Sequence, residues 1–228
     1  MIVDAIIPAL NEEGNMPFVL EGLASATIRR VIVVDNGSID RTGQAAAECG
    51  ATVVREPVRG YGRACLAGLR HLAMDPPEVV LFLDGDGSDD PASLPALLHP
   101  LESGQADLVI GSRTLGVAEA GALTPVQKFG NTLSVTLIKH LFGVSFTDLG
   151  PFRAITWPAL DRLEMADEDF GWTVEMQVKA ARRGLRCTEV PVRSRRRYSG
   201  DSKVSGTVSG SVKAGVKILY VIGRELII

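Results

Sequence analysis

Short apolar runs alternate with longer mixed segments along the first half of the chain. Several of these runs contain no polar position, which is typical of strands buried on both faces of a sheet. The mixed segments between them have the apolar spacing of helices. This alternation predicts an α/β fold in which a mostly parallel central sheet is flanked by helices. The predicted strands are 2–7, 31–34, 52–54, 79–83 and 108–110, and the predicted helices are 15–26, 41–49, 62–74 and 92–103.

The second half contains longer helical segments, predicted over 126–142, 171–183 and 207–226. A loop and a short strand are predicted over 147–155. A further strand, over 185–195, contains Pro191, which cannot donate a hydrogen bond to a neighbouring strand and therefore indicates the edge of a sheet. Because the chain shows no internal repeat, low-complexity tract or linker, we expect a single domain over residues 1–228.

Composition and charge narrow the possible environments. The three scattered cysteines argue against a disulfide framework or a zinc site and favour a reducing, cytoplasmic compartment. We see no signal peptide and no apolar stretch long enough to span a membrane. Residues 179–228 hold 12 of the 24 basic residues and three of the 27 acidic ones, a net charge of +9, whereas the preceding residues carry −12. This asymmetry predicts an anionic partner, such as a phosphate or a membrane surface. Nucleic acid is disfavoured, because only Tyr198 and Tyr220 are aromatic in this segment.

Four acidic residues, Asp84, Asp86, Asp89 and Asp90, directly follow the apolar run that ends at Leu83. Carboxylates so close together repel one another unless a cation joins them, and Mg²⁺ or Mn²⁺ prefers such oxygen ligands. We expect Asp84 and Asp86, two residues apart, to hold the metal. Asp89 or Asp90, just before a proline, suits the N-cap of the next helix. Two other polar stretches, 8–13 and 35–40, also follow predicted strands, and the carboxyl ends of such strands are where ligands bind.

The polar motifs, taken in order, resemble those of inverting family 2 glycosyltransferases, nucleotide-sugar enzymes with the GT-A fold. The motifs are IPALNEE (7–13), VVDNGSIDRT (33–42), GYGRA (60–64), LDGDGSDDP (83–91) and GSR (111–113). The later stretches TDLGPFRAI (147–155) and RYSGDSKVSGT (197–207) are similar to those of the polyprenyl-phosphate branch, of the dolichol-phosphate mannosyltransferase or glucosyltransferase type. The resemblance implies a nucleotide-sugar-binding half over 1–113 and an acceptor-binding half over 114–228.

The resemblance also implies roles for particular residues. The nucleotide sugar would be bound by Pro8, Ala9, Asn11, Glu12, Asp35, Gly60, Gly62, Asp84, Asp86, Arg197, Ser202 and Lys203. Within this set, Asp84 and Asp86 match the DxD pair that holds Mg²⁺ or Mn²⁺, while Gly60 and Gly62 could equally form only a tight turn. The residues implied in catalysis are Asp86, Arg113, Arg153 and Glu175, with the two arginines facing the acceptor. The chain departs from the family pattern at Asn36, Val58, Ser88 and Lys128.

The implied activity is metal-dependent, inverting transfer of a hexose from a UDP- or GDP-linked donor to a polyprenyl or dolichyl phosphate. An ionised phosphate acceptor needs no strong general base, whereas a soluble hydroxyl acceptor would need one of the carboxylates at 167–169 or Glu175. Two alternatives stay open: transfer to such a soluble acceptor, and a non-catalytic nucleotide-sugar-binding protein of the same fold.

The C-terminal helix suggests how the chain would reach a lipid acceptor. Lys213, Lys217 and Arg224 recur at spacings of four and seven and therefore share one side of the helix, which also carries large apolar residues. Such a helix could bind peripherally to the cytoplasmic face of a membrane or to a membrane subunit. It could equally dock on the domain and complete the core.

Overall fold

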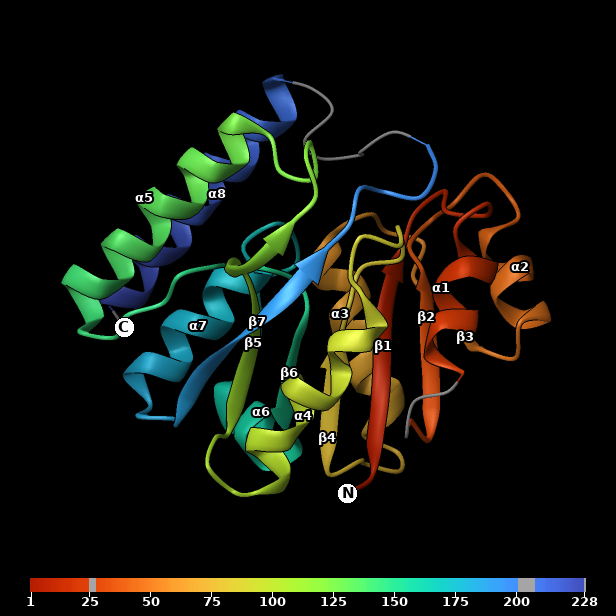
Figure 1. Ribbon diagram of the computed structural model, residues 1–228, viewed down its shortest axis with the longest axis horizontal. Coiled ribbons are helices and arrows are strands. Elements are labelled where there is room, and N and C mark those ends of the chain that lie inside the picture. The colour runs from red at the N-terminus through yellow and green to blue at the C-terminus, as the bar shows by residue number, and fades with distance from the viewer. Residues whose placement is uncertain (25–27, 201–207, 228) are drawn as a thin grey trace.

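A seven-stranded sheet forms the centre of the protein in a computed structural model that describes residues 1–24, 28–200 and 208–227 (Figure 1). The strand order is β3-β2-β1-β4-β6-β5-β7. The short strand β6 runs antiparallel to both of its neighbours, and the other paired strands are parallel. The strands are β1 (Val3–Ala9), β2 (Arg30–Asp35), β3 (Thr52–Arg55), β4 (Val79–Phe82), β5 (Leu108–Ala118), β6 (Arg153–Thr156) and β7 (Cys187–Ser194).

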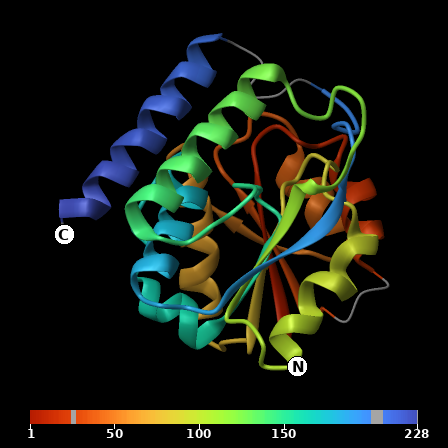
Figure 2. The same cartoon turned by 60° about the vertical axis from the view of Figure 1, so that its left-hand side comes forward.

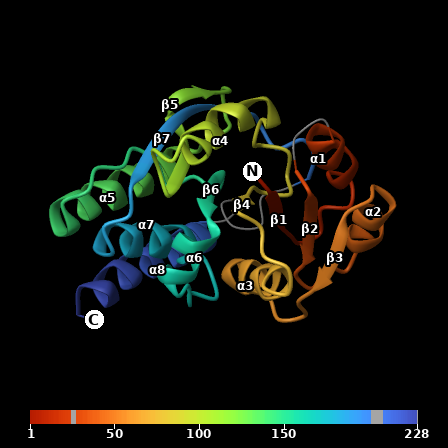
Figure 3. The ribbon, with the colours of Figure 1, turned by 90° about the horizontal axis from the view of Figure 1, so that it is seen from below.

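Helices cover both faces of this sheet. Figure 3 shows α1 and α4 on one side of the strands and α3 and α6 on the other. Neighbouring residues of one strand therefore enter different cores: Ile6 packs with α3, α6 and α7, and Ile7 packs with α1 and α4. The helices are α1 (Met16–Leu23), α2 (Thr42–Glu48), α3 (Tyr61–Leu72), η1 (Pro91–Ser93), α4 (Leu94–Glu102), α5 (Pro125–Phe142), α6 (Trp157–Leu163), α7 (Trp172–Arg182) and α8 (Val208–Ile227).

The predicted α/β fold is confirmed, with two differences in its elements. The helix α6 was not predicted, because it is short and begins directly after β6. β5 extends well beyond 108–110, and its outer part pairs again with β7 after an irregularity in the register. The expected boundary between the two halves, after residue 113, therefore falls within a strand. β7, which contains Pro191, lies at the edge of the sheet as predicted.

The last helix docks on the domain through its cationic side. Lys217 Nζ lies 2.9 Å from the buried carboxylate of Asp167, and Arg224 Nη2 lies 2.7 Å from that of Glu175. Val221 is buried beside them, in the core. The side chain of Lys213 lies outside the described part of the chain. Within that part, no helix combines the length and apolar character that a membrane crossing requires.

Candidate active site

A pocket of about 770 Å³ opens at the carboxyl ends of β1, β2 and β4. Parallel strands bring their following loops to the same edge of a sheet, which is why polar stretches far apart in the sequence meet here. The first turn of α5 and the segment after β7 complete the wall. Of the residues expected to bind a nucleotide sugar or act in catalysis, those lining the pocket are Pro8, Ala9, Glu12, Gly60, Asp84, Asp86, Arg113 and Arg197.

Asp84 is held by two residues whose contacts with it the sequence did not reveal, one at its carboxylate and one at its backbone. Tyr61, at the start of α3, donates from its hydroxyl to Asp84 Oδ1 at 3.1 Å. The backbone N–H of Asp84 donates to Asp89 Oδ2 at 2.9 Å. The predicted capping role is therefore wrong for Asp89 and confirmed for Asp90, which accepts from the N–H of Ala92 at the start of η1. Burial, with a contribution from the charge of Asp86, raises the pKa of Asp84 to about 7.

Asp86 lies beside the guanidinium of Arg197, which follows β7. Its Oδ1 accepts from the N–H of Ser88 at 2.9 Å, and its Oδ2 lies 3.3 Å from Arg197 Nη2. Arg197 Nη1 also donates to both carboxylate oxygens of Glu12, at 2.8 and 2.7 Å. Arg197 thus joins two sides of the pocket and places a positive charge beside the expected metal ligand.

The chemistry of the Asp84–Asp86 pair fits a divalent cation. Two carboxylates meet on one loop, burial and the nearby charge of Asp86 raise the pKa of Asp84, and a cation that prefers hard oxygen ligands would favour the charged form of Asp84. In the part of the chain that the structure describes, no group of three or more His, Cys, Asp or Glu side chains is arranged as a metal centre. Oxygen ligands from a donor diphosphate and water would complete the coordination, as Mg²⁺ commonly requires.

The pKa of Asp84 predicts that metal binding is linked to pH. The pKa of the Asp84 carboxyl is about 7 in the folded protein against an ordinary value of 3.8, so between these two pH values the metal-free fold binds more protons than the unfolded chain. Its contribution to stability is complete below 3.8 and is lost as pH rises through 7. A cation must displace this proton, so stabilisation by Mn²⁺ with UDP should grow as pH rises from about 5 to about 8. Thermal melts with and without Mn²⁺ measure this; an increment that is equal at all pH values would contradict it.

Residues 194–200, which we call the strap, pack against residues 84–90, which we call the acidic loop. The N–H of Arg195 donates to the carbonyl of Ser88 at 2.8 Å, and that of Tyr198 donates to the carbonyl of Asp86 at 2.9 Å. The ring of Tyr198 stacks on Phe18 of α1 with centroids 4.3 Å apart. These contacts place Arg197 over the pocket. Ser202 and Lys203, which follow the strap, lie outside the described residues.

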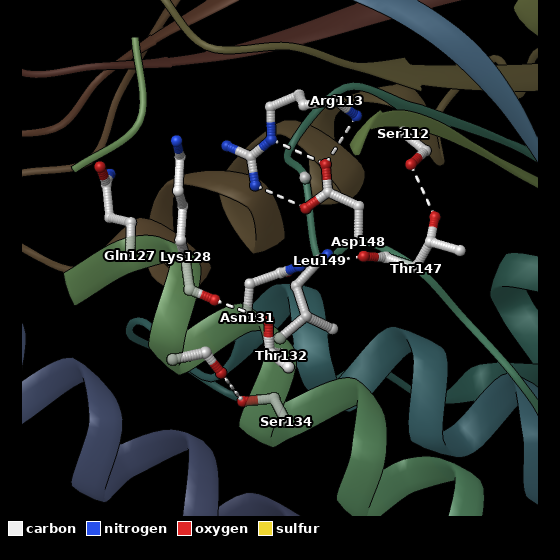
Figure 4. A network of polar contacts seen from close by, with 12 residues as sticks. Ser112, Arg113, Gln127, Lys128, Asn131, Thr132, Ser134, Thr147, Asp148 and Leu149 are labelled. Atoms are coloured by element: carbon white, nitrogen blue, oxygen red, sulfur yellow. Dashed lines mark hydrogen bonds and ion pairs between the residues drawn. The ribbon is translucent and has the colours of Figure 1, made fainter. Parts of the chain in front are cut away.

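Arg113 projects from β5 into the opposite side of the pocket. Its guanidinium makes a two-point contact with the buried carboxylate of Asp148, from Nε to Oδ2 at 2.8 Å and from Nη2 to Oδ1 at 2.7 Å. Figure 4 shows Gln127 and Lys128 extending from the start of α5 toward the end of this network where the guanidinium lies. Gln127 lines the pocket and Lys128 is exposed. Asp148 thus holds the Arg113 guanidinium in a fixed orientation, in an ion pair whose formal charges cancel.

Arg153 and Glu175, both implied in catalysis, are not among the pocket-lining residues. Arg153 is fully buried. It donates to the backbone carbonyls of Gly150 and Thr173 and to Oε1 of Gln177. Burial lowers the pKa of Arg153 to about 10. Glu175 is also fully buried, where it accepts from the N–H groups of residues 166 and 167 and pairs with Lys179 and Arg224. The contacts of both side chains are those of structural residues.

Three further residues expected at the nucleotide sit behind the pocket wall. Asn11 Oδ1 accepts from the N–H of Ile39, and Asp35 Oδ1 accepts from that of Ser38, so both organise the loop after β2. A Cβ on Gly62 would lie 1.9 Å from the carbonyl oxygen of Asp167, so Gly62 is needed for close packing of α3 against the segment before α7.

Asn36, where the family pattern often has an acid, is buried at the pocket edge. It donates to the carbonyl of Val58 at 2.7 Å and accepts from the N–H of Gly60 at 2.8 Å. An aspartate could not make the first of these bonds, because a carboxylate has no donor. Asn36 therefore shapes the turn that leads into α3.

The three carboxylates at 167–169 have separate surroundings. Asp167 is buried against Lys217, Glu168 pairs with Arg63, and Asp169 lines the pocket. Asp169 is thus the member of this run that a bound acceptor could reach.

Comparison with known proteins shows the family to which this chain belongs. A sequence profile of glycosyl transferase family 2 matches residues 4–162. An uncharacterized glycosyltransferase of Mycobacterium tuberculosis is 38% identical over 213 residues, which cover 93% of this chain and 94% of that protein. An undecaprenyl-phosphate mannosyltransferase of Micrococcus luteus is 32% identical over 227 residues, which cover 95% and 93%.

A solved structure shares the fold at lower sequence identity. Glucosyl-3-phosphoglycerate synthase of Mycobacterium tuberculosis, in complex with Mn²⁺, UDP-glucose and phosphoglyceric acid, superposes with a TM-score of 0.75 at 24% identity, over 97% of this chain and 80% of that one. The family match covers the loops that carry Asp84, Asp86 and Arg113, which meet at the pocket. The chain belongs to glycosyl transferase family 2 and is a nucleotide-sugar glycosyltransferase.

Proposed function

We propose that this glycosyltransferase moves a hexose, with inversion, from a UDP- or GDP-linked donor to a polyprenyl phosphate. The observation that supports this acceptor best is the side chain of Arg113, which lines the pocket in an orientation fixed by Asp148, with the exposed Lys128 next to the pocket-lining Gln127. The relative from Micrococcus luteus, which matches nearly the whole chain, is an undecaprenyl-phosphate mannosyltransferase. The cationic side chains support an anionic acceptor, and the relative supports one with a lipid tail.

The proposed reaction exchanges one bond for another at the anomeric carbon. An oxygen of the acceptor phosphate attacks that carbon while its bond to the nucleoside diphosphate breaks on the opposite face. The phosphate is already ionised near neutral pH, so its attack needs no proton removal. Arg113 and Lys128 would hold the acceptor, and Arg197 would face the departing diphosphate. Mg²⁺ or Mn²⁺ on Asp84 and Asp86 would supply charge neutralisation of that leaving group.

A donor and acceptor panel tests this proposal. UDP-glucose, UDP-galactose and GDP-mannose are each combined with Mg²⁺ or Mn²⁺ and a short-chain prenyl phosphate, and products are followed by mass spectrometry. One donor should yield a glycosyl phosphate whose anomeric configuration, measured by NMR, is opposite to that of the donor. Transfer only to hydroxyl acceptors, or retention of configuration, would overturn the proposal.

One observation favours a second candidate, transfer to a soluble hydroxyl acceptor. Such a reaction needs a general base, and Asp169 lines the pocket. The structural neighbour from Mycobacterium tuberculosis was solved with phosphoglyceric acid, a soluble compound.

Asp169→Asn separates the two candidates. With a prenyl phosphate acceptor we expect the rate to stay within about threefold of wild type, because an ionised phosphate needs no base, whereas loss of a general base costs about 10²-fold or more. Initial rates of product formation measure this, and Asp161→Asn, an exposed aspartate of α6, is the matched control. A hundredfold loss confined to Asp169→Asn would favour the hydroxyl acceptor.

A further inference from the structure

Two helices at one edge of the molecule expose large apolar side chains to solvent. Figure 2 shows α5 and α8 side by side at this edge, and the two helices are in contact. We call the exposed apolar residues on them the outer face: Val126, Phe129, Leu133, Val216, Leu219, Tyr220 and Leu226. Phe129 is 70% exposed, Val216 62% and Tyr220 60%. Large apolar side chains gathered on adjoining helices are typical of an interaction surface rather than of open solvent.

The helix α8 carries large apolar residues on both sides, because Val221 and Ile222 pack in the core while others stay exposed. Lys217 and Arg224, seven residues apart, point at buried carboxylates beside α7. Leu219 and Leu226 each follow two residues later, which places them about 200° around the helix, away from those carboxylates. The ion pairs therefore turn the charges inward and leave leucines outside. The helix is anchored to the domain, and its free side is apolar.

On α5 and the described part of α8, the charged side chains that are not buried are all basic. The exposed ionisable residues of α5 are Lys128, Lys139 and His140, and the sequence of α5 contains no acid. The only acid in α8 is Glu225, which is buried and paired with Arg182 and Arg224. An apolar surface with basic borders complements anionic lipid headgroups. A second copy of the same face would instead bring like charges together.

The outer face and the pocket adjoin at the start of α5. Thr124 and Gln127, in the first turn of α5, line the pocket, and Val126 and Phe129 lie in the same two turns. We infer that the outer face docks on an anionic lipid surface and so sets the mouth of the pocket at the headgroup level. A lipid acceptor could then reach Arg113 with its phosphate while its tail stays in the bilayer. This inference rests on the proposed polyprenyl phosphate acceptor, and it assigns the docking to α5 as well as to α8.

Vesicle flotation of the full chain tests the docking. The wild type should float with vesicles of phosphatidylcholine and phosphatidylglycerol, and less with phosphatidylcholine alone or at high salt. Phe129→Asp and Leu219→Asp should each lower the partition coefficient about tenfold, since each removes the burial of one large apolar side chain. Met74→Asp is the matched control: Met74 is 85% exposed and lies beyond the end of α3. Thermal melts verify that each variant is folded.

Three results would overturn the docking inference. The wild type could stay with the unbound protein in phosphatidylglycerol vesicles. Met74→Asp could weaken flotation as much as Phe129→Asp. Sedimentation velocity could show a dimer that Phe129→Asp converts to a monomer, in which case a second copy covers the outer face.

Transfer to a short-chain prenyl phosphate in lipid-free buffer separates this inference from the proposed function. Activity in that assay from a protein that never floats would sink the docking inference and leave the acceptor standing. Flotation without activity on any prenyl phosphate would refute the proposed acceptor and leave the docking inference standing. If both hold, Phe129→Asp should slow transfer to vesicle-embedded acceptor about tenfold and leave transfer in lipid-free buffer unchanged.

Discussion

Asp86→Asn is expected to slow sugar transfer roughly a thousandfold, because the carboxylate beside the leaving diphosphate is replaced by a neutral amide. The substitution preserves the shape of the side chain. Arg197 keeps its two bonds to Glu12, so the strap retains its anchor. Initial rates at saturating Mn²⁺ measure the effect, and thermal melts should show a folded protein.

A second measurement ties this loss to metal binding. Titration of Mn²⁺ in the presence of UDP should show affinity lowered about tenfold or more in Asp86→Asn, since one of two charged oxygen ligands is lost. Asp90→Asn provides the matched control on the same loop. It removes the ion pair to Arg195, while the asparagine Oδ1 can still cap η1, and should lower the melting temperature slightly while Mn²⁺ affinity stays unchanged. Full turnover by Asp86→Asn at ordinary Mg²⁺ would refute the metal assignment.

Glu175→Gln is expected to lower the melting temperature substantially and to leave chemistry nearly unchanged. The substitution leaves two cations, Lys179 and Arg224, facing a neutral amide in a buried site. Removing one member of a buried pair costs about 3 kcal/mol or more. For a domain of this size, that corresponds to a decrease of about 6 to 12 °C.

An exposed glutamate, Glu164, provides the matched control for Glu175→Gln. Glu164 is 79% exposed on its side chain and pairs with Arg183, so Glu164→Gln should have little effect on the melt. Transfer rates are then measured well below the melting temperature of each variant. Glu175→Gln should retain a rate within about twofold of wild type, whereas loss of a general base would cost about 10²-fold. A rate loss of that size in a fully folded Glu175→Gln would support the predicted catalytic role of Glu175.

Local patterns in the sequence were sufficient to predict the architecture and the acidic centre of the pocket. Uninterrupted apolar runs predicted β2 and β4, and a run broken only by Asp4 predicted β1. The polar stretches that follow these strands met at one edge, as parallel strands require. Asp84 and Asp86 could be identified as metal ligands because two close carboxylates on one loop repel each other unless a cation binds them. The helices α5, α7 and α8 were predicted from apolar periodicity alone.

Contacts between residues distant in the sequence could not be predicted from these local patterns. Tyr61 holds Asp84 from 23 residues away, and Asp148 orients Arg113 across 35 residues. The position of Tyr61 between two glycines was a signal that this segment packs closely, but periodicity does not say which carboxylate the hydroxyl will meet. Only the approach of α3 to the acidic loop decides that contact.

The direction in which charged residues point was likewise decided by the tertiary structure. The sequence by itself determined that Lys217 and Arg224 share one side of a helix, because their spacing is local. It also determined that a carboxylate lies at 175 and a guanidinium at 153. Whether a charge faces water, a ligand or a buried partner depends on what other segments bring to it. Here Asp167 and Glu175 draw the cations of α8 inward, and backbone carbonyls surround Arg153. An ion pair in the core and a charge in a pocket have the same residue types, so packing alone separates them.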